Sequence, residues 1–197
     1  MKFIRTNILV FLLILYVSGC NTHNRKPSEQ GYSANIKFLQ KGEKIATATQ
    51  KELLKNVSAA LEHGGPTYAI DFCNTRAMEL TDSLSQEFNC TIERISLKNR
   101  NPGNYPDSET EMEQLKRYKN LHEQGKELMP ATVTFNDIVE YYQPIIIGME
   151  TCLKCHGELG DNVNEETRQA LERLYPKDRA TNYQLHDFRG LWKISFN

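Results

Sequence analysis

The chain has 197 residues, 39% of them hydrophobic and 25% charged, which is typical of a globular protein and excludes a disordered, collagen-like or polytopic membrane protein. Its 24 lysines and arginines nearly balance 25 aspartates and glutamates, so there is no basic excess to neutralise a nucleic-acid backbone. We therefore expect one folded domain and no nucleic-acid partner.

The N-terminus has the features of a bacterial secretory signal. Cationic residues precede an unbroken apolar run, 8–17, which is too short for a bilayer-spanning helix of about 20 residues. Ser18 and Gly19 then precede Cys20, and this arrangement resembles the lipobox of bacterial lipoproteins, in which the cysteine is lipidated and becomes the new N-terminus. The resemblance implies a signal peptide at 1–19, a lipid anchor on Cys20 and a periplasm-facing position in the bacterial cell envelope. A plain secretory signal or an uncleaved anchor is the alternative.

Residues 20–41 are predicted to form a polar tether. The segment contains Pro27, Ser28 and Gly31 but no apolar periodicity, which is typical of a linker. We therefore expect the folded domain to comprise residues 42–197.

Two amphipathic helices are predicted at the start of this domain. Apolar residues recur at helical spacing in 43–61, and the sequence His-Gly-Gly-Pro at 63–66 predicts an interruption. A second helix is expected at 66–88, with Cys73 facing the interior. Its apolar stripe consists of Ile70, Cys73, Ala77, Leu80, Leu84 and Phe88.

Strands and one further helix are predicted in the rest of the chain. A strand rich in isoleucine at 91–97 is followed by a loop rich in proline, glycine and asparagine at 98–107. Ser108 and Glu111 form a capping pair that predicts a helix running toward Gly125. Further strands are expected at 132–135, 139–147 and 191–196. Because helices precede most of the strands, the predicted class is α+β.

A haem-attachment motif spans residues 152–156, Cys-Leu-Lys-Cys-His. In such a CxxCH motif, two thiols one helical turn apart add to the haem vinyl groups, and the histidine ligates the iron. With five cysteines and five histidines in the chain, chance would produce this motif about 0.003 times. Cys152, Cys155 and His156 therefore predict one covalently bound haem c. A redox CxxC motif or half of a zinc site is the alternative.

The position opposite His156 could be filled by a side chain, by water or by a gas. Cys73 is a candidate because its apolar stripe could form the wall of a haem pocket, whereas Met149 is too close to the motif to reach over the ring. Alternatively, Cys73 is a core cysteine or forms a disulfide with Cys90. A straight helix at 66–88 would hold these cysteines roughly 25 Å apart, beyond the limit of about 7 Å for a disulfide. Cys90 is expected to be a buried thiol.

A resemblance to a known family is carried by four segments: 69–73 (AIDFC), 94–107 (RISLKNRNPGNYPD), 152–157 (CLKCHG) and 190–192 (GLW). Together they resemble the single-haem c-type domains with a PAS-like fold, formerly a domain of unknown function, found alone and in bacterial sensor proteins. The resemblance covers most of the mature chain and departs only at Phe196, where an aliphatic residue is usual. It implies an antiparallel sheet flanked by helices, with axial ligation of the iron by Cys73 and His156.

The proposed ligation has electrostatic consequences. A thiolate from Cys73 would favour oxidised iron and lower the reduction potential. Arg94, Lys98 and Arg100 are candidate partners of the haem propionates, because charge-assisted hydrogen bonds would hold the edge of the ring. The alternative is that these residues form a solvated cationic strand and loop.

Two functions from different classes are expected. The first is a membrane-tethered, periplasm-facing mono-haem cytochrome that exchanges one electron with a redox partner protein. The second is a haem-based sensor, in which a redox change or a diatomic gas displaces Cys73 and alters the surface offered to a partner. No kinase, methyl-accepting or transmembrane output segment follows Phe196, so we expect any signal to pass to another protein, which favours the cytochrome. We do not expect an enzyme, because we find no carboxylate pair, nucleophile motif or phosphate-binding loop.

Overall fold

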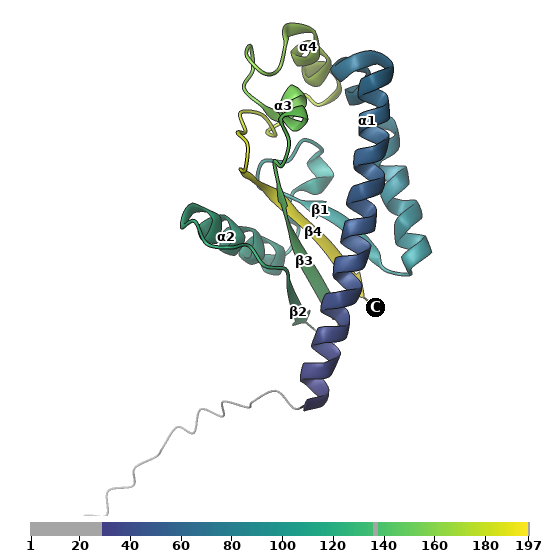
Figure 1. The fold of residues 1–197 in the computed structure, drawn as a ribbon, viewed down its shortest axis with the longest axis vertical. Coiled ribbons are helices and arrows are strands. Elements are labelled where there is room, and N and C mark those ends of the chain that lie inside the picture. The colour runs from purple at the N-terminus through teal and green to yellow at the C-terminus, as the bar shows by residue number, and fades with distance from the viewer. Residues whose placement is uncertain (1–28, 136–137, 197) are drawn as a thin grey trace, which may run out of the picture.

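The computed structural model describes residues 29–135 and 138–196, which form a four-stranded antiparallel sheet flanked by helices (Figure 1). The strands lie in the order β1-β4-β3-β2. Their bounds are Thr91–Ile95 for β1, Ala131–Phe135 for β2, Ile138–Ile146 for β3 and Phe188–Phe196 for β4. The helices are α1 (Glu29–Phe88), α2 (Glu109–Glu123), α3 (Glu150–His156) and α4 (Glu165–Leu174). The predicted α+β class with an antiparallel sheet is confirmed, whereas the predicted signal peptide and Cys20 lie outside the described residues.

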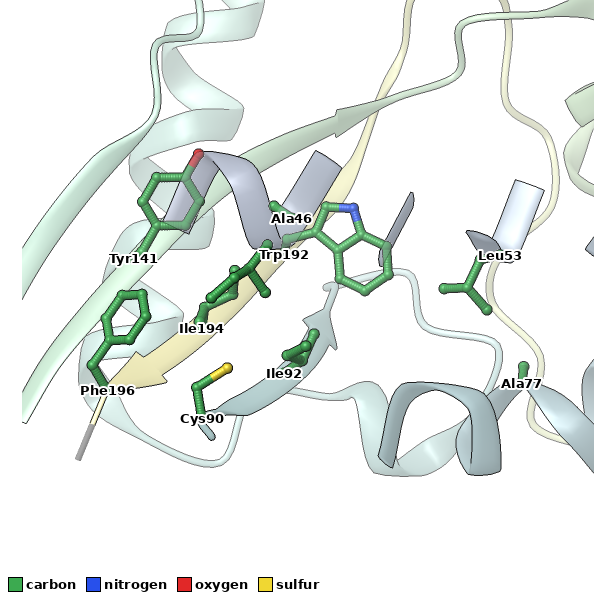
Figure 2. Close-up of a cluster of buried hydrophobic side chains, with 10 residues drawn as sticks. Ala46, Leu53, Ala77, Cys90, Ile92, Tyr141, Trp192, Ile194 and Phe196 are labelled. Atoms are coloured by element: carbon green, nitrogen blue, oxygen red, sulfur yellow. The ribbon is translucent and has the colours of Figure 1, made fainter. Parts of the chain in front are cut away.

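The sheet has two apolar faces because successive residues of a strand point to opposite sides. On one face, Trp192 of β4 and Tyr141 of β3 belong to a core cluster with residues of α1, and Figure 2 shows this cluster. On the other face, Leu191 and Tyr142 pack with Leu115 of α2. Figure 1 accordingly shows α1 and α2 on opposite sides of the sheet.

Helix α1 is interrupted at Gly64 and Gly65, as the sequence predicts. Gly65 has a φ of 72°, a left-handed conformation that glycine adopts without strain. The chain folds back there, so that α1 has a first limb before the two glycines and a second limb after them (Figure 1). Both limbs contribute to the core cluster, with Leu53 from the first and Ala77 from the second (Figure 2).

Helix α1 begins at Glu29, whereas the sequence predicts a tether up to residue 41, so this part of the tether prediction is corrected. Phe38 and Leu39 pack against the core cluster. A segment with few apolar residues shows no helical periodicity, but packing of those few against the sheet stabilises the helix, and such tertiary contacts supply most of the stability of helices in proteins.

Replacing Gly42 by alanine should lower the free energy of unfolding by about 1–3 kcal/mol, because it overpacks a tight contact. A β-carbon at position 42 would overlap the ring of Tyr141, so either this side chain or the helix would have to move. Urea denaturation measures the effect. Gly103→Ala is a matched control, since its added carbon would approach only Asn101 Oδ1, at 3.5 Å. Equal unfolding midpoints for Gly42→Ala and the unaltered protein would contradict this packing.

The other predicted elements are found within a few residues of their expected bounds. The Ser108 side chain accepts the Glu111 N–H at 3.2 Å at the start of α2, as predicted. Strand β1 ends at Ile95, two residues earlier than expected. Helix α4 was not predicted, although Asn164 caps it by accepting the Thr167 N–H at 2.9 Å.

Residues 29–135 and 138–196 contain no helix with the length and apolar character of a membrane span.

Candidate cofactor site

A cavity of about 430 Å³ lies where one end of the sheet meets both limbs of α1 and helix α3. Its walls are mostly apolar and include Leu53 from the first limb, Ile70 from the second limb and Ile147 after β3. The volume falls within the range of about 300–1,000 Å³ that is usual for small-molecule sites. Figure 1 shows α3 and α4 beyond this end of the sheet, beside the bend in α1.

The CxxCH motif forms α3, and all three of its functional side chains border the cavity. Cys152 and Cys155 are one helical turn apart, and His156 is the last residue of the helix. Both cysteines are free thiols. Burial raises the pKa of the Cys155 thiol to about 11, so it is protonated near neutral pH. The helix therefore presents two cysteines and one imidazole to the same space.

Within the part of the chain that the structure describes, the His156 imidazole has a hydrogen-bond partner at one nitrogen only. Its Nδ1 lies 2.7 Å from the Ala180 carbonyl oxygen, which can only accept, so Nδ1 carries a proton. Burial lowers the pKa of His156 well below its ordinary value, and the charges of Arg100 and Arg189 lower it further. The ring is therefore neutral near pH 7. A neutral histidine held by its other nitrogen is the usual form of a metal ligand.

Cys73 lies in the second limb of α1 and borders the same cavity as His156. Burial raises the pKa of its thiol, while the nearby charges of Arg94 and Arg100 oppose this rise. Cys73 is a free cysteine, so the alternative of a disulfide with Cys90 is wrong. Cys90 is instead buried in the core cluster at the opposite end of the second limb, as expected of a structural thiol (Figure 2).

The three predicted cationic residues have different surroundings. Arg94 borders the cavity, and its guanidinium lies 5.7 Å from the centre of the Trp192 ring. Arg100 also borders the cavity, but it is engaged with Asp178 and with peptide carbonyls. Lys98 is directed elsewhere, since its Nζ donates to the Thr181 carbonyl at 2.7 Å and lies 4.1 Å from the centre of the Tyr183 ring. The structure therefore brings Arg94 and Arg100, but not Lys98, to the cavity.

Sequence reasoning missed a further arginine at the site, Arg189 in β4. Its Nη1 donates to Ser96 Oγ at 2.9 Å and to the Lys98 carbonyl at 3.0 Å. Burial lowers the pKa of Arg189 to about 10. Within the described ranges, neither Arg94 nor Arg189 forms an ion pair, and no aspartate or glutamate borders the cavity. The cavity therefore has uncompensated positive charge on one side.

The comparison with known families decides the classification. A sequence model of the Tll0287-like family (Tll0287) matches residues 25–197. The chain belongs to the Tll0287-like family. Among solved structures, the crystal structure of the cyanobacterial heme-protein Tll0287 is similar, with a TM-score of 0.63 and 22% sequence identity over 82% of this chain and 96% of that chain. No curated protein matches the chain. The predicted membership of a haem-domain family is confirmed.

The match to the Tll0287-like family model covers the whole described fold, including every residue that borders the cavity. Cys73, Cys152, Cys155 and His156 share this cavity, but within residues 29–135 and 138–196 no three His, Cys, Asp or Glu side chains are arranged so that they could hold a metal ion by themselves.

Proposed function

We propose that this Tll0287-like chain is a c-type cytochrome that transfers one electron, with a single haem c attached through Cys152 and Cys155 and ligated by His156 and Cys73. One observation carries the proposal: the CxxCH helix and Cys73 border the same apolar cavity. The similar structure is described as a heme-protein, which supports the same cofactor here. The role is that of a carrier and not of an enzyme.

The residues around the cavity fit this cofactor. Two thiols stand one turn apart on α3, and the neutral His156 keeps Nε2 unprotonated and free to bind a metal. When bound, the haem would supply the one-electron chemistry. The chain would supply the attachment at Cys152 and Cys155, the apolar surroundings, and His156 and Cys73 as ligands of the iron. Cys73 would bind as a thiolate, because coordination to a metal deprotonates a thiol even where burial opposes its ionisation.

The uncompensated charge of Arg94 and Arg189 supports their contact with the haem propionates. Arg94 and Arg100 were predicted from the sequence and both border the cavity, as Arg189 does, but Arg100 is already paired with Asp178. Buried cations are costly unless they are paired, and two carboxylates at the ring edge would pair them.

Replacing either Arg94 or Arg189 by glutamine should make the reduction potential depend on pH near neutrality. A propionate beside an arginine keeps a low pKa. Removing the arginine lets the pKa of the propionate rise toward the pH range of the titration. Potentiometric titration between about pH 5 and 8 measures the change. Lys98→Gln is the control, because Lys98 bonds to the Thr181 carbonyl. Equal pH profiles for Arg94→Gln, Arg189→Gln and the unaltered protein would exclude these contacts.

We further propose that the protein is tethered to the bacterial cell envelope through a lipidated Cys20 and faces the periplasm. The order of charge, apolar run, small residues and cysteine supports this position. Cys20→Ser should release most of the protein from the membrane fraction into the soluble fraction of the producing cells. Retention of the variant in the membrane fraction would instead indicate an uncleaved anchor.

A haem-based sensor is a second candidate, favoured by the break in α1 at Gly64 and Gly65. Cys73 lies on the limb that follows this break, so release of Cys73 could change the angle between the limbs. Absorption spectra of both oxidation states, with and without carbon monoxide, distinguish the two functions. A carrier should keep both axial ligands, and carbon monoxide should leave the reduced spectrum unchanged. A new carbon monoxide spectrum would favour the sensor over the carrier.

A further inference from the structure

Arg100 and Asp178 form a buried charge pair beside His156. Arg100 lies in the loop after β1, and Asp178 lies in the segment between α4 and β4. Arg100 Nε donates to Asp178 Oδ2 at 2.9 Å, and the two side chains are only 13% and 9% exposed. Removing one member of such a pair leaves the other buried and unpaired, which usually destabilises a protein.

The pair is connected to the peptide that precedes His156 and to the carbonyl that holds its imidazole. Arg100 Nη2 donates to the Cys155 carbonyl at 2.5 Å, directly before His156 in α3. It also donates to the Ala180 carbonyl at 3.3 Å, the same oxygen that accepts the His156 Nδ1 proton. Asp178 Oδ1 accepts the Ala180 N–H at 2.7 Å, so the carboxylate fixes the peptide on which this bond depends.

Further bonds join the segment of residues 178–183 to the same two elements. The Arg179 N–H donates to the Asn99 carbonyl at 3.0 Å, and the Tyr183 N–H donates to the His156 carbonyl at 2.9 Å. The Ala180 carbonyl is therefore held between the loop after β1 and the end of α3. Its position determines the direction in which the imidazole points.

We propose that Arg100, balanced by Asp178, is the positioning residue for His156: its guanidinium bridges the Cys155 and Ala180 carbonyls and so fixes the orientation of the imidazole and the nitrogen that carries its proton. This inference rests on the proposed function, in which His156 is an axial ligand. It gives Arg100 a role different from the propionate contact expected from the sequence. Lysine cannot perform this role, because only guanidinium presents several donors in one rigid plane.

The test uses full-length protein matured in a host that attaches haem c. The variants are Arg100→Lys, which keeps the charge, Arg100→Gln and Asp178→Asn. Arg173→Gln is the control, because Arg173 forms an exposed pair with Asp71. Electron paramagnetic resonance of the oxidised protein reports the orientation of the axial ligands, and thermal unfolding reports stability independently.

We expect all variants to retain covalently attached haem, because Cys152 and Cys155 are unchanged. Arg100→Lys and Asp178→Asn should replace the single low-spin signal by two or more signals, whereas Arg173→Gln should leave it unchanged. If Arg100→Gln does not fold, Arg100→Lys and Asp178→Asn still test the inference. If each folded variant keeps the wild-type signal and only its unfolding temperature falls, the inference is overturned, and Arg100 and Asp178 have a structural role only. Absence of covalent haem in the unaltered protein would instead refute the proposed function.

Discussion

Replacing Cys73 by alanine should change the absorption spectrum of the oxidised protein and raise its reduction potential. A thiolate stabilises oxidised iron more than reduced iron, and each tenfold preference lowers the potential of a one-electron couple by about 59 mV. The variant should therefore have a potential higher by at least about this amount. Cys73 lies in the second limb of α1 and borders the same cavity as His156. The effect should be large because the variant would lose one of the two proposed ligands of the iron.

Cys90→Ala is a matched control for this experiment. It removes the same thiol group from the same chain, but Cys90 lies in the core cluster and not among the residues that border the cavity. The control should unfold more easily and keep the wild-type spectrum and potential. If Cys73→Ala also keeps the wild-type spectrum, Cys73 is not an axial ligand.

Replacing both Cys152 and Cys155 by serine should abolish covalent attachment of haem. Serine keeps the size and helical position of each residue but has no thiol to add to a vinyl group. Each single variant retains one thiol and should show reduced attachment. Haem staining after denaturing electrophoresis measures attachment, because only covalently bound haem stays with the unfolded chain.

The control for attachment is Cys73→Ala, which leaves both thiols of α3 in place and should keep the haem stain. His156→Ala should also retain some stain, since the thiols remain, but it should lose the low-spin spectrum. An equal stain for the double serine variant and the unaltered protein would show that these thiols do not hold the haem.

The regular elements were predictable where local patterns are strong. The Gly64 and Gly65 break, the Ser108 cap and the isoleucine-rich strand β1 each follow from neighbouring residues in the sequence. The helix before residue 42 was not predictable in this way, because Phe38 and Leu39 gain their stability from the distant core cluster. Helix α4 had a usable signal in the Asn164 cap and the apolar residues near Ala170.

The part of the site that depends on the spacing of residues in one short motif was predictable. The CxxCH spacing identified Cys152, Cys155 and His156, and all three border one cavity with Cys73. The roles of the arginines depend on tertiary contacts that no local pattern contains. Arg189 directly precedes the Gly-Leu-Trp segment at 190–192, which is the only sequence signal that could have identified it.

The most direct measurement is the intact mass of the mature protein, produced in a host that attaches haem c and analysed under denaturing conditions. We expect the mass of the processed polypeptide plus one haem, in a coloured sample. A colourless sample with the mass of the polypeptide alone, from a host that loads a known c-type cytochrome in parallel, would contradict it.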